Sequence, residues 1–291
     1  MSLQIDQKHA YARRPSSRAL SPFRYPGGKG FLTDLLRQKL MEIPGPTRGY
    51  AEPFCGGAGA AINLLLDGDA DSIFINDLDA RVYSAWMAIV TETERFVDCL
   101  ERAKVTVDEW HRQKRIATDH VSGYSFEAGF ATFFLNRTSR AGIVIGSGPV
   151  GGYEQSGNWK IDARFYRDTM VNRVKHIGAK RQSILVSNLS ATDFLQSLHS
   201  SGRAANTFVF IDPPYFEIGS RLYLDGMGEN GHAILAKHLR NGLAKNWLMT
   251  YDDHPEIRKL YQGFQITELE VLYSLQRQRK VNEIVIQAAG A

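Results

Sequence analysis

Short apolar runs bounded by turn residues constrain this chain more than any other feature. Seven of them have the length and content of buried strands, at residues 49–54, 72–76, 184–187, 207–211, 246–250, 267–273 and 282–287. Most lack the polar alternation of a sheet with one face in water, so they predict a sheet covered on both faces. Helical periodicity lies between them, at 31–41, 58–66, 81–90 and 232–243. Strands alternating with helices predict a doubly wound, mostly parallel, seven-stranded α/β fold.

The middle of the chain interrupts this alternation. Residues 96–116 and 126–136 have helical patterns, and residues 142–160 are glycine-rich and indicate a hairpin or loops. We therefore expect an α/β core over residues 21–95 and 182–291, a mainly helical insert over 96–181, and a flexible arm over 1–20.

Composition excludes several classes of protein. The 291 residues are 43% hydrophobic and 23% charged, which is typical of a globular chain rather than a disordered or collagen-like one. Cys55 and Cys99 are too few for a disulfide framework or a cysteine metal site, so we expect a reducing, cytoplasmic setting. No apolar run of about 18 residues occurs, so we expect no transmembrane helix and no membrane partner.

Basic charge is concentrated in the insert. Residues 101–181 carry 14 basic and 8 acidic side chains, whereas the segments on either side are nearly balanced. A localised basic field suits a polyphosphate such as a nucleic acid. A solvated helical surface explains the same charges, so charge alone leaves both interpretations open.

The sharpest chemical signal is the corner Asp212-Pro213-Pro214-Tyr215, which follows the apolar run 207–211. Ligands of open α/β sheets bind beyond the carboxyl ends of the strands. Because proline lacks an N–H group and restricts the residue before it, the corner is stiff and offers acceptors, the Asp212 carboxylate and the Pro213 carbonyl. Beside the flat ring of Tyr215, these acceptors suit a planar exocyclic amine of a base. A rigid turn capped by Asp212 is the structural alternative.

A glycine-rich loop over residues 51–59, containing Glu52, Phe54 and Gly56, joins a strand to a helix. Glycine lets the backbone pass close to a ligand, and a helix start offers free N–H groups. The next strand ends at Asp77, where an acid can hold the two hydroxyls of a ribose. Together, the glycine-rich loop and Asp77 predict a nucleoside-bearing cofactor. Taken alone, the loop could be an ordinary turn and Asp77 a surface residue. The loop lacks the G-x-G-x-x-G spacing of dinucleotide-binding loops.

A third segment, residues 23–30, has the sequence Phe-Arg-Tyr-Pro-Gly-Gly-Lys-Gly and precedes a predicted helix. Tyr25 could stack on a base, and Lys29 could bind a carboxylate or a carbonyl. An ordinary loop explains the segment equally well.

In this order, the three segments resemble the Dam-like, alpha-class DNA adenine-N6 methyltransferases. That family has an F-x-x-G-G-K segment, an E-P-F-x-G-x-G loop, a target-recognition insert and then D-P-P-Y. The resemblance continues through residues 133–138, 251–253 and 282–286 and covers residues 20–287. It implies a methyltransferase sheet, S-adenosylmethionine as cofactor without a metal, and double-stranded DNA as partner. It also implies a bacterial or phage-encoded enzyme that acts as a monomer on DNA, with a cognate restriction endonuclease as a further candidate partner.

The resemblance assigns roles to individual residues. It implies a catalytic corner of Asp212, Pro213, Pro214 and Tyr215, and cofactor contacts from Tyr25, Lys29, Glu52, Phe54, Gly56, Asp77, Asp193, Phe194 and Asp212. The family pattern after the second strand is Asn-Asp-x-Asn, whereas this chain has Asp at position 79. Either Asp77 or Asp79 is therefore a candidate for the ribose.

Candidates for nucleic-acid contact lie in and beside the insert. Arg and Asn suit bidentate pairing with base edges, and basic side chains suit phosphates. On this ground we expect contacts from Arg24, Asn136, Arg137, Arg140 and Lys160. Solvated or salt-bridged side chains are the alternative for each of them.

The expected reaction is methyl transfer to N6 of an adenine that is flipped out of the duplex, which costs a few kcal/mol. The alternatives are N6 methylation of adenine in RNA, N4 methylation of cytosine in DNA, and a catalytically silent DNA-binding regulator. A nicotinamide dehydrogenase is a weaker alternative because the glycine spacing does not match.

Overall fold

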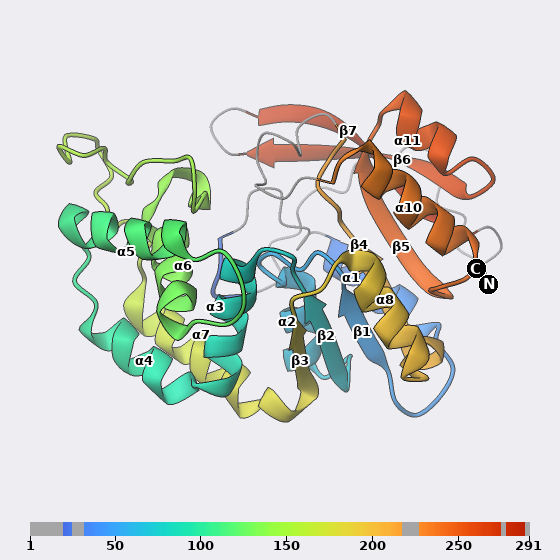
Figure 1. Ribbon diagram of the computed structural model, residues 1–291, viewed down its shortest axis with the longest axis horizontal. Coiled ribbons are helices and arrows are strands. Elements are labelled where there is room, and N and C mark those ends of the chain that lie inside the picture. The colour runs from blue at the N-terminus through green and yellow to red at the C-terminus, as the bar shows by residue number, and fades with distance from the viewer. Residues whose placement is uncertain (1–19, 25–31, 217–226, 275–277, 289–291) are drawn as a thin grey trace.

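The computed structural model describes residues 20–24, 32–216, 227–274 and 278–288. At its centre is a seven-stranded sheet with the strand order β3-β2-β1-β4-β5-β7-β6 (Figure 1). The strands are β1 (Gly49–Glu52), β2 (Ser72–Asn76), β3 (Ile184–Ser187), β4 (Thr207–Ile211), β5 (Asn246–Asp252), β6 (Gln265–Ser274) and β7 (Gln278–Gln287). Strands β1 to β5 pair in parallel, and β7 pairs antiparallel with β5 and β6. The predicted α/β fold with a mostly parallel, seven-stranded sheet is confirmed.

Alternate residues of the central strands pack into two cores on opposite faces of the sheet. Tyr50, Phe208 and Phe210 belong to one core, and Ala51 and Val209 belong to the other. Helices α1 (Thr33–Met41), α2 (Gly59–Asp67) and α3 (Ala80–Thr91) pack in the first core. Helices α8 (Ala191–Ser200), α10 (Glu229–Arg240) and α11 (Pro255–Leu260) pack in the second. Burial on both faces explains why the strands lack polar alternation.

The core helices lie close to the predicted ones, except that residue 31 is outside the described residues. Helices α8 and α11 were not predicted. Helix α8 starts with a local signal, since the Ser190 hydroxyl accepts from the Asp193 N–H at 3.1 Å, a capping arrangement. None of the described helices has the length and apolar content that crossing a lipid bilayer requires.

The insert forms a helical lobe beside the sheet, at the left of Figure 1. It contains α4 (Thr93–Arg102), α5 (Val107–Asp119), α6 (Phe126–Thr138) and α7 (Arg167–Ala179). The prediction of one continuous helix over 96–116 is wrong. The chain leaves α4 after Arg102, and the Thr106 hydroxyl accepts from the Glu109 N–H at 3.2 Å to cap α5. Residues 142–160 form turns with one isolated bridge, between Ser139 and Pro149.

The lobe shares the first core with the sheet. Phe96 and Phe133 on the lobe helices pack edge to face, with ring centroids 5.3 Å apart, and both belong to the same cluster as Trp86 of α3. Helix α6 also crosses α3 closely at Gly129, where a Cβ would lie 2.4 Å from the Ser84 carbonyl oxygen. The insert is therefore joined to the α/β core through buried side chains and a close helix crossing.

Candidate active site and nucleic-acid interface

The strand order reverses between β1 and β4, and ligands of doubly wound sheets bind at such a point. Four of the predicted site segments follow the carboxyl ends of adjacent strands here. The Asp193 segment follows β3, Asp77 follows β2, the glycine loop follows β1, and Asp212 follows β4. The sheet topology thus brings together residues that are far apart in the sequence.

Asp77 lies against the glycine loop. Its carboxylate accepts the N–H of Gly56 at 2.9 Å and the N–H of Asp79 at 3.0 Å. Gly56 has a φ of 44°, in the left-handed region that glycine adopts readily, and this turns its N–H toward the acid. Burial, with a smaller contribution from Asp79, raises the pKa of Asp77 to about 7. The Asp77 carboxylate is therefore held by two backbone N–H groups, and burial has a larger effect on its pKa than any charged neighbour.

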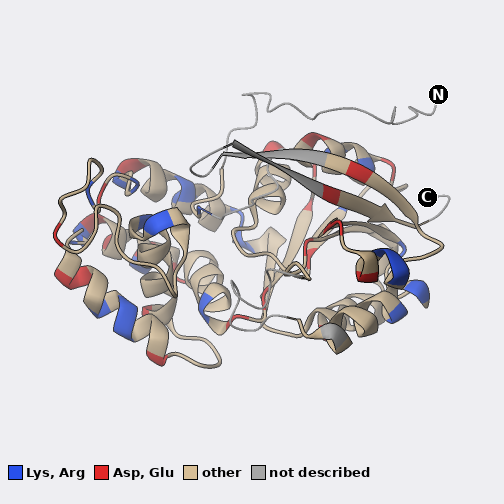
Figure 2. Cartoon of the chain, turned by 90° about the horizontal axis from the view of Figure 1, so that it is seen from above, with Lys and Arg blue, Asp and Glu red and all other residues tan. Residues whose placement is uncertain are grey.

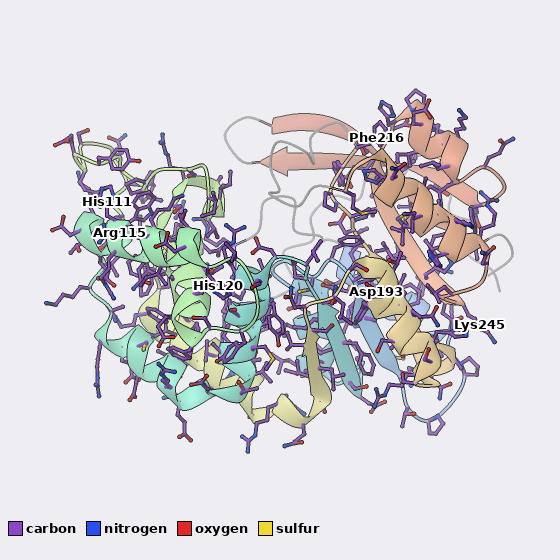
Figure 3. The ribbon with its side chains drawn as sticks, in the orientation of Figure 1. His111, Arg115, His120, Asp193, Phe216 and Lys245 are labelled. Carbon is purple, nitrogen blue, oxygen red and sulfur yellow. The ribbon has the colours of Figure 1, made fainter. Side chains whose placement is uncertain are left out.

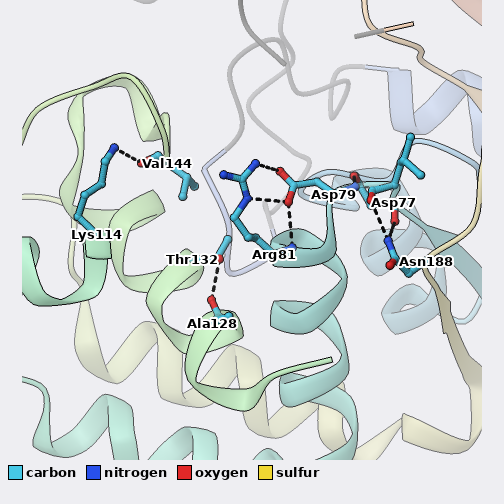
Figure 4. Close-up of polar contacts among 9 residues, drawn as sticks. Asp77, Asp79, Arg81, Lys114, Ala128, Thr132, Val144 and Asn188 are labelled. Atoms are coloured by element: carbon cyan, nitrogen blue, oxygen red, sulfur yellow. Dashed lines mark hydrogen bonds and ion pairs between the residues drawn. The ribbon is translucent and has the colours of Figure 1, made fainter. Parts of the chain in front are cut away.

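Asp79 is committed to other contacts, as Figure 4 shows. Its carboxylate caps α3 by accepting the Arg81 N–H at 2.9 Å, and it also accepts from the Arg81 guanidinium at 2.7 and 2.5 Å. Asn188 donates to the backbone carbonyls of Asp77 and Leu78 at 2.8 and 2.9 Å and fixes the turn between them. Of the two acids, Asp77 is the one that the geometry favours for a ligand.

Asn76 ties the strand ends together, a role that was not predicted. It is fully buried and donates to the carbonyls of Pro53 and Leu189, each at 2.9 Å. Its amide oxygen accepts from the Ser187 hydroxyl at 2.8 Å. The signal was a buried polar residue at the end of an apolar strand, which requires local hydrogen-bond partners.

Glu52 is buried at the end of β1, where its carboxylate accepts from the Tyr50 hydroxyl and the Ala61 N–H, both at 3.1 Å. Burial raises the pKa of Glu52 to about 8, and the negative charge of Asp212 adds to this rise. Glu52 and Asp212 therefore lie within electrostatic reach of each other across β1 and β4. The predicted neighbour Phe54 is half-buried and packs against the second core.

Asp193 and Phe194 lie in the first turn of α8, and Figure 3 labels Asp193. The Asp193 side chain is exposed and accepts from the Ser190 hydroxyl at 2.6 Å. Phe194 is buried in the second core. Asp193 stays available to a ligand at its surface position, whereas the Phe194 ring already has a packing role.

The Asp212–Tyr215 corner is held by side chains of neighbouring strands. The Thr250 hydroxyl of β5 donates to Asp212 Oδ1 at 2.7 Å, and the Tyr215 hydroxyl donates to Oε1 of the buried Glu283 on β7. Tyr215 is half-buried, and Pro213 and Pro214 lie between these two anchored residues. Neither Thr250 nor Glu283 was predicted from the sequence. A charged Glu at the start of the apolar run 282–287 was the available signal for the latter.

Two predicted cofactor residues, Tyr25 and Lys29, lie outside the described residues. Arg24, just before them, is joined to the insert. Its N–H donates to Asn136 Oδ1 at 2.7 Å, and Asn136 Nδ2 donates back to the Arg24 carbonyl at 2.6 Å. Asn136 is buried and donates also to the Gly142 carbonyl at 3.0 Å. This geometry favours a structural role for the Asn136 side chain over contact with a base edge.

The other predicted nucleic-acid contacts differ in accessibility. Arg137 is buried, and its guanidinium donates to the Arg164 carbonyl. Arg140 is exposed, and Lys160 is exposed with its ammonium on the Gln155 carbonyl at 2.5 Å. Arg140 and Lys160 are therefore the members of the predicted set with solvent-facing side chains.

Arg137 belongs to a group of four arginines that we call the arginine cluster: Arg24, Arg137, Arg164 and Arg173. Burial and the charges of Arg24 and Arg173 lower the pKa of Arg137 to about 10. Burial and then Arg164 lower the pKa of Arg24. Within the described parts of the chain no ion pair joins any of the four to an acid. Several Lys and Arg residues also mark the helices of the lobe in Figure 2. The positive charge of the arginine cluster, which no acid pairs with in the described residues, attracts anions.

Exposed aromatic rings accompany these arginines. Trp159 is 64% exposed with the Arg164 guanidinium 5.3 Å from its ring centroid, and Tyr166 is 53% exposed. Arg164 also donates to the Tyr166 hydroxyl at 3.2 Å. Basic groups interleaved with exposed aromatic rings are typical of surfaces that bind nucleic acids.

Known proteins that are similar to this chain include methyltransferases. The chain is 21% identical over 252 residues to the type II methyltransferase M.CviBI of Paramecium bursaria Chlorella virus NC1A, and the similar region covers 86% of this chain and 89% of that protein. Two structures of the rRNA methyltransferase aviRa from Streptomyces viridochromogenes are 13% identical, with TM-scores of 0.40 and 0.42. The similar regions cover 97% and 96% of this chain and 95% and 94% of the two aviRa chains.

A family model provides the assignment. Residues 25–275 match the model of the D12 class N6 adenine-specific DNA methyltransferases. This match includes the glycine loop, Asp77, the insert and the Asp212–Tyr215 corner. The chain therefore belongs to the D12 class N6 adenine-specific DNA methyltransferase family.

Proposed function

We propose that this methyltransferase modifies adenine N6 at a specific DNA sequence, with residues 212–215 as its catalytic corner. The observation that supports this most is the placement of Asp212. It follows β4 beside the β1 loop, its Oδ1 accepts from Thr250 at 2.7 Å, and its charge adds to the rise in the pKa of Glu52 that burial causes. This is the switch point of the sheet, where a base and a nucleoside cofactor can meet.

The corner acts by binding and orienting the base. A stacked adenine is out of reach, so the target base is extruded from the duplex. The Asp212 carboxylate and the Pro213 carbonyl accept the two N6 hydrogens, which favours a pyramidal nitrogen with its lone pair directed at the methyl donor. Tyr215 stacks on the purine ring and keeps it in that orientation. S-adenosylmethionine, when bound, supplies an electrophilic methyl group on its sulfonium.

The residues around the glycine loop fit this cofactor. A Cβ at Gly59 would meet nothing within 4 Å, so there is open space at the start of α2. Asp77 offers a carboxylate to the two ribose hydroxyls, with Glu52, Phe54, Gly56, Asp193 and Phe194 on the neighbouring strand ends. Tyr25 and Lys29 complete the proposed set from the preceding segment. This donor set is suited to a nucleoside, and we expect no metal.

We assign target recognition to the insert, residues 96–181. The arginine cluster, with Arg140 and Lys160, supplies positive charge for phosphates, and Trp159 and Tyr166 supply exposed rings. The bipartite catalytic domain then comprises residues 21–95 and 182–291. We also propose that the enzyme acts as a monomer on double-stranded DNA in the cytoplasm. The similarity to a type II methyltransferase supports a pairing with a restriction endonuclease.

The test is methyl transfer with labelled S-adenosylmethionine. Methylome sequencing of a host that expresses the chain identifies the target site, and duplex DNA with that site is compared with RNA of the same sequence. We expect label in DNA that nuclease digestion recovers as N6-methyladenine. Asp212→Ala should reduce the rate by at least about a hundredfold, because it removes an acceptor that aligns the nucleophile.

Label on cytosine N4 or only in RNA would contradict the proposal, and so would full activity of Asp212→Ala. Absence of methylation by the wild-type protein, with intact DNA binding, would instead support a silent regulator. A matched control is Glu94→Ala, which removes an exposed carboxylate in the first turn of α4, outside the proposed recognition and cofactor residues, and should leave the rate unchanged.

A further inference from the structure

The catalytic corner has little backbone support of its own. Pro213 and Pro214 have no N–H groups, so neither can donate a hydrogen bond to a neighbouring strand. Residues 212–215 also belong to no helix or strand. A segment of this kind keeps a fixed position only if side chains from other elements hold it.

Three side chains from β5 and β7 hold the segment at both ends, two through Asp212 and Tyr215 and one through Phe216, which follows it. Thr250 donates to Asp212 Oδ1 at 2.7 Å, and Asp252 Oδ1 accepts the N–H of Phe216 at 3.1 Å. Glu283 accepts the Tyr215 hydroxyl through Oε1. We call Thr250, Asp252 and Glu283 the strand clamp.

Sheet geometry explains why these three can act on one segment. Thr250 and Asp252 are two residues apart on β5, so their side chains lie on the same face. Asp252 is paired with Glu283 in the antiparallel β5–β7 register, and directly opposed residues also share a face. The two neighbouring strands therefore present three polar side chains in a row along the corner.

Burial argues that the Glu283 contact is more than packing. Its side chain has no exposed surface, and a buried carboxylate carries a desolvation cost that an apolar residue of similar size would avoid. A hydroxyl that donates to a carboxylate forms a charge-assisted hydrogen bond, which is stronger and more directional than a neutral one. Glu283 can thus fix the far end of Tyr215 and limit the swing of its ring.

Thr250 has the corresponding effect on Asp212. Its hydroxyl donates to one carboxylate oxygen and so fixes the rotation of the carboxyl group, which sets the direction of the other oxygen. The proposed reaction requires both a fixed direction of the Asp212 acceptor oxygen and a fixed position of the Tyr215 ring.

We infer that Thr250 and Glu283 are positioning residues for methyl transfer: Thr250 orients the Asp212 carboxylate, and Glu283 orients the ring of Tyr215. This inference rests on the proposed function. Neither residue touches the base or the cofactor in this account, and each acts through its partner in the corner.

A double-mutant cycle tests the Glu283 part. Wild type, Glu283→Gln, Tyr215→Phe and the double variant are assayed for kcat and KM on duplex DNA with the target site. Tyr215→Phe keeps the ring and removes the hydroxyl, and Glu283→Gln weakens the acceptor. We expect each single variant to lower kcat about tenfold with little change in the KM for S-adenosylmethionine, because the charge-assisted hydrogen bond that fixes the Tyr215 ring is lost.

The double variant decides the result. If Glu283 acts through the Tyr215 hydroxyl, Glu283→Gln adds almost nothing in the Tyr215→Phe background. Multiplicative losses, or unchanged kcat in either single variant, would overturn this assignment. Tyr261→Phe is the matched control, since its buried hydroxyl makes no hydrogen bond in the described structure and its removal should not alter kcat.

Thr250 is tested by rescue. Thr250→Val keeps the shape and removes the hydroxyl, whereas Thr250→Ser restores the donor. We expect kcat to fall about tenfold or more in Thr250→Val, a loss of the size expected for a displaced reacting group, and to recover in Thr250→Ser. Equal kcat for the two variants would overturn the inference.

A fluorescent base separates positioning from folding. With 2-aminopurine at the target position, extrusion raises the fluorescence and stacking on Tyr215 lowers it again. We expect the bound-state intensity to change in Glu283→Gln and Tyr215→Phe but not in Tyr261→Phe, while thermal unfolding shows all variants folded. Unchanged intensity in the first two would contradict a positioning role. If the wild type methylates no DNA adenine, the proposed function fails and this inference fails with it.

Discussion

At the scale of single residues, the candidate site contains two carboxyl groups whose pKa values are raised mainly by burial. Asp77 has a pKa of about 7 and Glu52 of about 8, whereas the usual values are 3.8 and 4.5. Both folded-state pKa values are raised above those of the unfolded chain. Their contribution to stability is therefore fully present below about pH 4 and is lost as the pH rises through 7 to 8.

The Asp77 pKa predicts how cofactor binding depends on pH. Ribose hydroxyls donate to the ionised carboxylate, so affinity for S-adenosylmethionine should rise about tenfold per pH unit up to pH 7 and then level off. Calorimetric titration between pH 5 and 9 measures this. Asp77→Asn should bind S-adenosylmethionine weakly and with a flatter pH profile. Without ligand, this variant should lose less stability than the wild type as the pH rises from 5 to 8. A pH-independent affinity in the wild type would contradict the assignment of Asp77 to the ribose.

At the scale of secondary-structure elements, the crossing of α3 and α6 joins the insert to the core. The close approach needs a residue without a side chain at Gly129, because a Cβ would lie 2.4 Å from a backbone oxygen and 2.9 Å from the Ala85 nitrogen. Backbone atoms of packed helices cannot move aside locally, unlike the end of a flexible side chain.

Gly129→Ala is therefore expected to destabilise the protein by about 1–3 kcal/mol, the usual cost of overpacking. Gly231→Ala is the matched control in α10, where a Cβ would be 3.4 Å from the nearest atoms, on the Met227 side chain. That variant should gain about 0.5–1 kcal/mol from helix propensity. Urea unfolding of both variants measures the difference, and equal midpoints would show that the helices can separate at this crossing.

At the scale of the whole molecule, the insert and the sheet meet along residues 20–24, the segment before the proposed cofactor residues. Residues 20–24 contact the core through Asn63, which accepts the Leu20 N–H at 3.1 Å, and the insert through Asn136 and Arg173. The arginine cluster is assembled by this junction, since Arg24 comes from the junction segment and the other three arginines from the insert. A binding surface built this way exists only in the folded chain.

The cluster predicts the salt dependence of DNA binding. Arg164→Gln should weaken binding to all sequences and reduce the slope of log Kd against log salt by about 0.9 for each phosphate that the variant no longer neutralises. Arg203→Gln is the control, because this exposed residue precedes β4 and lies at the end of the strand opposite the proposed catalytic corner. Fluorescence anisotropy at several salt concentrations measures both. An unchanged slope in Arg164→Gln would place the phosphate contacts elsewhere.

The sequence by itself determined the strands, most core helices and the corner at 212–215. Burial periodicity and the backbone limits of Pro and Gly are local properties, readable from adjacent residues. The tertiary structure decided which polar groups meet, through contacts between residues 38, 68 and 112 positions apart: Thr250 with Asp212, Tyr215 with Glu283, and Arg24 with Asn136. It favoured Asp77 over Asp79 for the ribose, and a structural role for Asn136. Strand order and helix crossings bring these partners together, and the spacing of residues along the chain determines neither of them.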